Sequence, residues 1–166
     1  MAFVCGLVLS TTIDVSAQRS TRTRRAAAAA RAKAELKKGA EDVAIQIKNI
    51  SRFVFVLGGV ATGIEEIDKD VKAGKASRAI AAQNEEFKAN VRASVRGIRV
   101  GLAKLEGDFR TKSALRKYLL DIEGVAARGG IAEDLAAGGK FNASGRELLL
   151  VVEHLADALV AMPSGK

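Results

Sequence analysis

The sequence predicts an all-α protein, an antiparallel up-down four-helix bundle with a basic N-terminal arm. Beyond residue 40, apolar side chains recur in steps of three and four, which is the spacing of helices that each bury one face. Of the 166 residues, 48% are hydrophobic, 4% are aromatic and one is proline, and this composition gives an all-β sandwich or barrel little support. The length suits one domain with a hydrophobic core.

Positive charge is concentrated in two blocks of the chain. The net charge is +8; residues 18–38 carry eight bases against one acid, and residues 87–117 carry nine bases against two acids. Composition therefore divides the chain into three parts: an apolar N-terminal segment at 1–17, a basic arm rich in Ala, Arg and Lys at 18–39, and a helical bundle at 40–163.

The N-terminal segment has features of an export signal. Residues 2–13 are uncharged and largely apolar, which is too short a stretch for a bilayer span of ~20 residues and about the length of a signal-peptide core. The small residues Val15-Ser16-Ala17 then resemble a cleavage site before Gln18, although no positive charge precedes the apolar stretch. We predict a signal peptide at 1–17 and a periplasmic or secreted protein; the alternative is a short buried element in a cytoplasmic protein.

The basic arm is built of strong helix formers, yet it has no apolar stripe beyond alanine. We expect either a solvated basic arm or the frayed first turns of a longer helix, with a break at Gly39. Arg24, Arg25 and Arg31 are its candidate anion-binding residues. No aromatic side chain is interspersed among them, so stacking on nucleic-acid bases is not available.

Two long apolar stripes predict helices at 43–73 and 78–107, which should fold back on each other as a hairpin. Ser77 is the expected N-cap of the second helix. No charged residue occurs between Phe53 and Ile64, so this section should be buried on most sides and is too short to span a membrane. Glycines within it predict a bend or a close neighbour; they are Gly58, Gly59 and Gly63.

Two shorter helices should complete the bundle. The third is expected to begin at Asp108 or Thr111 and to be interrupted at Gly129-Gly130. Residues 138–145 have the composition of a loop. Ser144 and Glu147 then match a capping box that opens the last helix, which Pro163 ends.

Catalytic and cofactor-binding patterns are missing from the sequence. His154 is the only histidine and Cys5 the only cysteine, which excludes a disulfide framework and a Cys-based zinc site. Acids near His154 supply no complete ligand set, and neither a Glu-x-x-His motif nor a phosphate-binding glycine loop occurs. We therefore predict no enzymatic activity, no cofactor and no metal.

Four bases form a row along the second predicted helix, at spacings of four, four and three: Lys88, Arg92, Arg96 and Arg99. Like charges at these spacings repel one another, so the row needs compensation. One interpretation is a set of acids on adjacent helices; the candidates are Glu65, Glu66, Asp121 and Glu123. The other is an anion-binding face.

These observations leave three functional hypotheses. The favoured one is an exported, non-enzymatic helical-bundle protein that binds a partner protein or an anionic envelope polymer or lipid surface. The alternative is an intracellular, histone-like protein that binds nucleic acid through the arm and the basic row. The third is a ligand-binding or enzymatic bundle with a pocket near residues 58–63. Leftover apolar surface also makes a second copy of the chain a candidate partner.

Overall fold

The computed structural model describes the backbone of residues 15–163 and the side chains of residues 21–163. Over this range every regular element is helical, which confirms the all-α prediction. The predicted signal peptide lies outside the described residues except for 15–17, which begin the first helix. The elements are α1 (Val15–Lys72), α2 (Arg78–Thr111), the short 3₁₀ helix η1 (Arg116–Tyr118), α3 (Val125–Ala137) and α4 (Phe141–Ala161).

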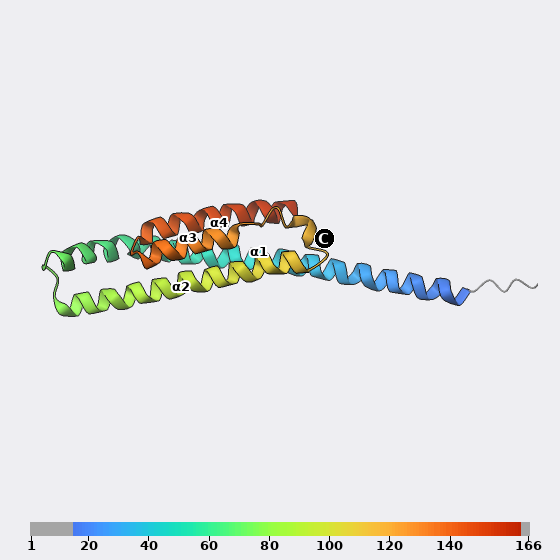
Figure 1. Cartoon of the computed structure of the whole chain (residues 1–166), viewed down its shortest axis with the longest axis horizontal. Helices are drawn as coiled ribbons and strands as arrows, with labels where there is room; N and C mark the ends of the chain where they lie inside the picture. Colours follow the sequence, from blue (N-terminus) through green and yellow to red (C-terminus); the bar gives the residue numbers. More distant parts are fainter. Residues whose placement is uncertain (1–14, 164–166) are drawn as a thin grey trace, which may run out of the picture.

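The helices contact one another as a ring. α1 packs against α2 and α4, and α3 packs against the same two helices (Figure 1). α1 and α2 lie side by side and run in opposite directions, joined by a tight turn. With 58 residues against 34, α1 is ~85 Å long and α2 ~50 Å, so the N-terminal part of α1 extends beyond the other helices.

One hydrophobic core lies between the helices. It draws on the stripes that the sequence predicts, and its largest fully buried side chains are Phe109 and Phe141. Burying each large apolar side chain contributes ~1.5–3 kcal/mol. Further fully buried members come from α1, α2 and α4: Val43, Ile50, Val95, Leu102, Leu148 and Leu155.

A polar cluster interrupts this core near the α1–α2 turn. Asn84 Nδ2 donates hydrogen bonds to the Ile64 carbonyl at 3.2 Å and to Asp68 Oδ1 at 2.9 Å. Lys88 Nζ donates to the same Asp68 oxygen at 2.9 Å. Sliding one helix along the other would leave these buried groups unpaired, at a cost of ~1–3 kcal/mol each, so the cluster sets the register of α1 and α2.

The predicted break at Gly39 is wrong, because α1 continues through it. Gly39 is buried, and a Cβ atom there would collide with the side chain of Leu115. The glycine therefore allows the segment after α2 to approach α1 closely. Of the two expectations for the arm, the first turns of a longer helix is the one observed. Ser77 is confirmed as the N-cap of α2, since its Oγ accepts from the Ile80 amide at 3.3 Å.

The third helix begins later than the sequence predicts. Residues 112–124 form turns and η1, and Gly124 at φ 93° adopts a left-handed conformation directly before α3. The expected interruption at Gly129-Gly130 is also wrong, since both lie inside α3. A Cβ at Gly129 would lie 2.9 Å from Leu102 Cδ1, so this glycine allows α3 to pack closely on α2.

The predicted loop at 138–145 is shorter in the structure. Only Gly138–Lys140 connect α3 to α4, with Gly139 at φ 74° making the turn. The prediction of a capping box at Ser144 is wrong as well. Ser144 lies inside α4 and is fully buried, and its Oγ donates a hydrogen bond to the Ala132 carbonyl at 2.8 Å. The expected helix end before Pro163 is confirmed.

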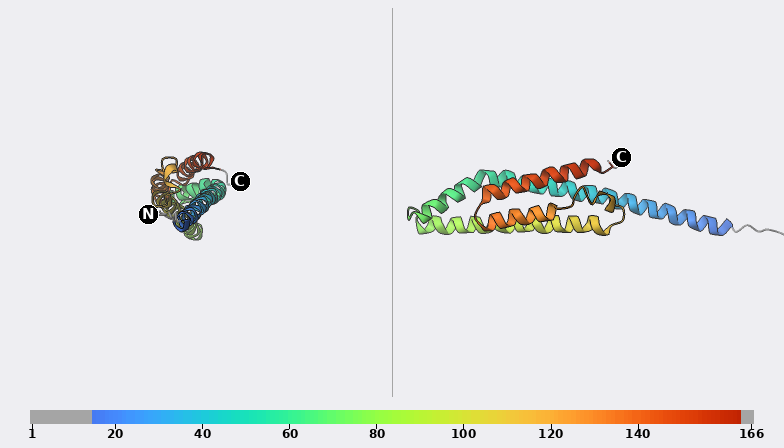
Figure 2. Two further views of the ribbon diagram at one scale, coloured as in Figure 1. Left: turned by 90° about the vertical axis from the view of Figure 1, so that its right-hand side faces the viewer. Right: turned by 45° about the horizontal axis from the view of Figure 1, so that its top comes forward.

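The uncharged section of α1 between Phe53 and Ile64 is not buried on most sides. Phe55 is 84% exposed and Val56 is 63% exposed. The glycines of this section have no close neighbour, since nothing lies within 4 Å of a Cβ built at Gly58, Gly59 or Gly63. Figure 2 shows α1 changing direction between its middle and its C-terminal third.

Candidate functional site

Residues 18–39, which the sequence predicts to be a basic arm, lie within α1. Residues 21–31 are exposed, and so are the predicted anion-binding residues Arg24, Arg25 and Arg31. Among the described side chains, ion pairs begin only at the base of the arm, with Lys37–Glu41 at 3.8 Å and Lys38–Asp42 at 2.9 Å. The positive charges further out are therefore available to an anionic partner.

The arm meets the rest of the protein at a shallow hollow of about 450 Å³ beside Ser113. Arg24 and Arg31 line this hollow together with Glu35, the only acid between residues 18 and 38. Glu35 Oε2 is buried and has no hydrogen-bond partner among the described residues. Two of the three predicted arm residues thus lie where α1 leaves the packed part of the molecule.

The α2 row differs from the arm, because each of its bases has a partner within the protein. Lys88 is 8% exposed and pairs with Asp68 at 2.9 Å and with Glu85 at 2.7 Å. Burial lowers the pKa of Lys88, but the hydrogen bonds to Glu85 and Asp68 outweigh it, so that the pKa lies above its ordinary value of 10.5.

The other three bases of the row bind α3. Arg92 Nε donates to the Ala136 carbonyl at 3.3 Å, near the C-terminus of α3 where carbonyls lack intrahelical partners. Arg96 and Arg99 share Glu133, at 2.9 and 3.2 Å. These contacts compensate the row within the fold; anion binding by these four residues stays a prediction.

The compensating acids are not the ones that the sequence indicated. Glu65 binds Asn142, and Glu123 lies 3.5 Å from Arg110. Asp68 and Glu133 take the compensating role instead. The helical period alone does not say which acid of a neighbouring helix comes opposite a given base, because that depends on the register between helices.

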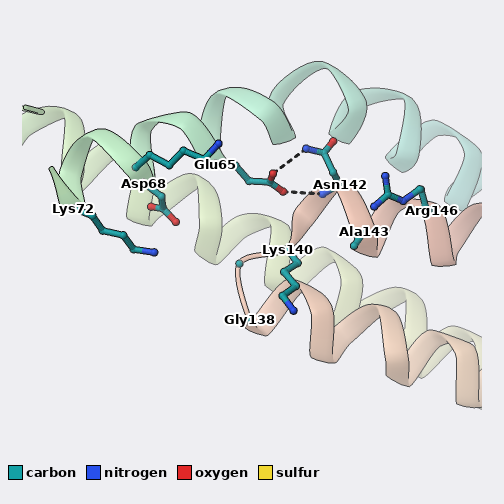
Figure 3. A pocket seen from close by; sticks show the side chains of 10 residues that line it. Glu65, Asp68, Lys72, Gly138, Lys140, Asn142, Ala143 and Arg146 are labelled. Carbon is teal, nitrogen blue, oxygen red and sulfur yellow. Dashed lines mark hydrogen bonds between the residues drawn. The ribbon is translucent and has the colours of Figure 1, made fainter.

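A second cationic feature lies at the other end of α1, in a pocket of about 420 Å³. Its walls are the C-terminal part of α1, the connection from α3 to α4 and the first turns of α4 (Figure 3). Lys69, Lys72, Lys140 and Arg146 line it, and none of the four takes part in an ion pair among the described residues. The pocket lies next to residues 65–72 rather than 58–63.

The two carboxylates of this pocket are engaged by the protein itself. Glu65 accepts from the Asn142 backbone amide at 3.0 Å and from Asn142 Nδ2 at 3.1 Å, which caps the first turn of α4 (Figure 3). Asp68 accepts from Lys88 and Asn84. The pocket therefore carries a net positive charge and can hold a small anion. Sequence reasoning missed it, since its cations lie far apart in the chain and join only through the fold.

The part of the chain that the structure describes has no cluster suited to a metal ion. No group of three or more His, Cys, Asp or Glu side chains is placed there to hold one. One helix, within Thr21–Lys72, is long and apolar enough to cross a membrane by length and composition alone, and 17% of its most apolar window is buried.

In comparisons with known proteins, no family model, curated protein or solved structure matches this chain.

Proposed function

We propose that this chain is an exported, non-enzymatic binding protein, built as an up-down four-helix bundle with a basic arm, and that it binds an anionic surface through the arm. The ring of contacts among α1, α2, α3 and α4 supports the bundle. The observation that carries the function is the contrast between the two basic blocks. The α2 row has internal partners, whereas the exposed arginines of the arm form no ion pair among the described side chains.

The geometry of the arm suits a surface better than a pocket ligand. Its cations point in several directions around one helix and lie along ~20 Å of it between residues 21 and 35. An anionic lipid layer or polymer supplies many charges over such a length, and each Lys or Arg near an anionic membrane contributes ~1 kcal/mol. Nucleic acid also carries regularly spaced phosphates, and it is the competing partner in the test.

The test measures binding of the full chain to vesicles. The protein should co-sediment with phosphatidylglycerol vesicles and not with phosphatidylcholine vesicles, and the binding should weaken as salt rises because ions screen the arm. The triple variant Arg24→Gln, Arg25→Gln, Arg31→Gln removes three exposed charges. We expect it to bind about 100-fold more weakly, at ~1 kcal/mol for each charge.

A matched variant removes three exposed cations elsewhere: Lys75→Gln, Lys104→Gln and Arg116→Gln. It changes the net charge equally and should retain most of the vesicle binding. Equal losses in the two triple variants would mean that only net charge matters and would overturn the role of the arm. Tighter binding to duplex DNA than to vesicles at the same salt concentration would favour the nucleic-acid alternative.

Export has a test of its own. When the full-length gene is expressed in a bacterium with a periplasm, mass spectrometry of the periplasmic fraction should find a mature chain that begins at Gln18. A chain that retains Met1 and stays in the cytosol would contradict export and strengthen the nucleic-acid alternative.

A further inference from the structure

The exposed side of α1 opposite the core carries an unusual set of residues. Leu57, Ala61 and Ile64 face the core and are at most 4% exposed. On the opposite side of the helix lie six exposed residues, which we call the glycine face: Arg52, Phe55, Val56, Gly59, Gly63 and Glu66.

Packing within the chain does not account for the glycines of this face. A Cβ at Gly39 or Gly129 would strike a neighbouring side chain, so the fold requires glycine at those positions. A Cβ at Gly59 or Gly63 would meet nothing within 4 Å. Each such glycine weakens the helix by ~1 kcal/mol relative to alanine. Small residues four apart allow a second helix to approach the backbone closely.

Phe55 and Val56 make the same face apolar. They are 84% and 63% exposed, and soluble proteins seldom leave large apolar side chains clustered in water unless a partner covers them. The core-facing side of α1 is already occupied by α2 and α4. A partner must therefore come from outside the bundle.

We propose that the partner is a second copy of this chain, docked antiparallel with a two-fold axis at Gly59. In that arrangement residues equally far before and after Gly59 face each other. Arg52 and Glu66 lie seven residues on either side of it, so each Arg52 meets the Glu66 of the other copy. Phe55 and Gly63 lie four residues on either side, so each phenyl ring covers a glycine.

Charge and size complementarity choose this arrangement over a parallel one. In a parallel pair Arg52 would face Arg52, Glu66 would face Glu66, and Phe55 would face Phe55 beside a gap between glycines. Like charges in register repel, and two-fold symmetry with self-complementary patches is the usual form of a homodimer. Neither Arg52 nor Glu66 has an ion-pair partner among the described residues. The inference is independent of the proposed function of the arm.

The first test is the mass of the full chain by sedimentation equilibrium, over a range of protein concentrations. We expect a reversible change from 17.4 kDa to twice that mass. Gly59→Leu and Gly63→Leu together should keep the protein monomeric, with a dissociation constant raised at least about 100-fold. Gly97→Leu is the matched control, since Gly97 is also a helical glycine with nothing within 4 Å, and it should still form dimers.

Charge reversal tests the pairing itself. Arg52→Glu alone and Glu66→Arg alone should each raise the dissociation constant about 10- to 100-fold, because each dimer contains the pair twice. The double variant Arg52→Glu, Glu66→Arg should restore dimerisation. Both positions are exposed, and far-UV circular dichroism checks that each variant folds.

Orientation is tested by disulfide formation in a Cys5→Ser background. Val56 and Thr62 lie three residues on either side of Gly59, so a mixture of Val56→Cys and Thr62→Cys proteins should form the mixed disulfide. Self-crosslinking of Val56→Cys alone would overturn the antiparallel arrangement. A monomer at all concentrations, or a chain that inserts into neutral vesicles through this face, would overturn the dimer.

Discussion

The Asp68–Asn84–Lys88 cluster yields a prediction whose size follows from burial. Lys88→Met removes the positive charge but keeps an unbranched side chain of similar length, so the apolar contacts of the stem remain. The change leaves Asp68 with only the Asn84 amide as a side-chain partner among the described residues. It also removes the 2.7 Å ion pair with Glu85.

The two ion pairs that this substitution removes differ in strength. The Glu85 side chain is 62% exposed and lies three residues from Lys88 on the same helix, so this pair contributes only ~0.3 kcal/mol. The Asp68 side chain is 22% exposed and that of Lys88 is 10% exposed. Their pair lies between exposed pairs at ~0.2–1 kcal/mol and buried pairs at ~3–5 kcal/mol, so we expect ~2 kcal/mol. The total loss of ~2.3 kcal/mol corresponds to a fall in Tm of about 5–9 °C.

The assay is urea unfolding at pH 7 followed by far-UV circular dichroism, with the free energy of unfolding obtained by linear extrapolation. Lys104→Met is the matched control, because Lys104 is exposed and takes part in no ion pair among the described residues, and it should change the free energy by less than ~0.5 kcal/mol. The double variant Lys88→Met, Asp68→Asn should recover ~1 kcal/mol, since it no longer leaves a charge unpaired. A loss below ~0.5 kcal/mol for Lys88→Met, or no recovery in the double variant, would refute the reasoning.

Three further predictions concern the Lys88–Asp68 ion pair and the glycines of α3. Because the pKa of Lys88 is raised above 10.5, the ion pair stabilises the fold fully below that pH and loses its effect as pH rises through the folded-state pKa. The difference in free energy of unfolding between wild type and Lys88→Met should therefore stay constant from about pH 7 to 9 and shrink in more alkaline solution. Urea unfolding at each pH measures this difference. A decrease below pH 9 would contradict the raised pKa of Lys88. Gly130→Ala should raise the free energy of unfolding by ~1 kcal/mol, because nothing lies within 4 Å of its Cβ position. Gly129→Ala should lower the free energy of unfolding by ~1 kcal/mol, because the new methyl group must displace the buried Leu102 side chain. Equal effects of the two substitutions would show that α3 does not pack on α2 through Gly129.

The helical period predicted the long elements well. Residues of the apolar stripes, such as Ile50 in α1 and Leu102 in α2, are fully buried, and Ser77 caps α2 as expected. Even Asp68 and Asn84, which occupy stripe positions as polar residues, bind each other. Where a stripe is long, many side chains support the same assignment, and local exceptions do not change it.

Glycines account for two of the errors in the predicted helix boundaries. Gly39 and Gly129 have the sequence context of helix ends, yet each lies inside a helix where another part of the chain comes close. Gly124 and Gly139 do mark boundaries, through positive φ angles. A sequence shows that a glycine is present, but whether it serves a turn or a close contact depends on what the fold brings next to it.

The candidate binding features divide in the same way. The cluster of positive charge at residues 18–38 is visible in the sequence because its eight bases are close together in the chain. The cationic pocket is not visible there, because Lys72 and Lys140 come together only when α1 meets the α3–α4 connection. The exposure of Phe55 could not be predicted either, since an uncharged stretch looks the same whether a neighbouring helix or water lies beside it.

The continuity of α1 has a mechanical consequence. No joint separates the cationic end from the core, because one uninterrupted helix contains both. A flexible tail would connect its end to the core without fixing their relative orientation. A continuous helix is stiff, so the orientation of its end and that of the core are coupled. An orientation imposed on the N-terminal end of α1 would therefore be passed on to the core.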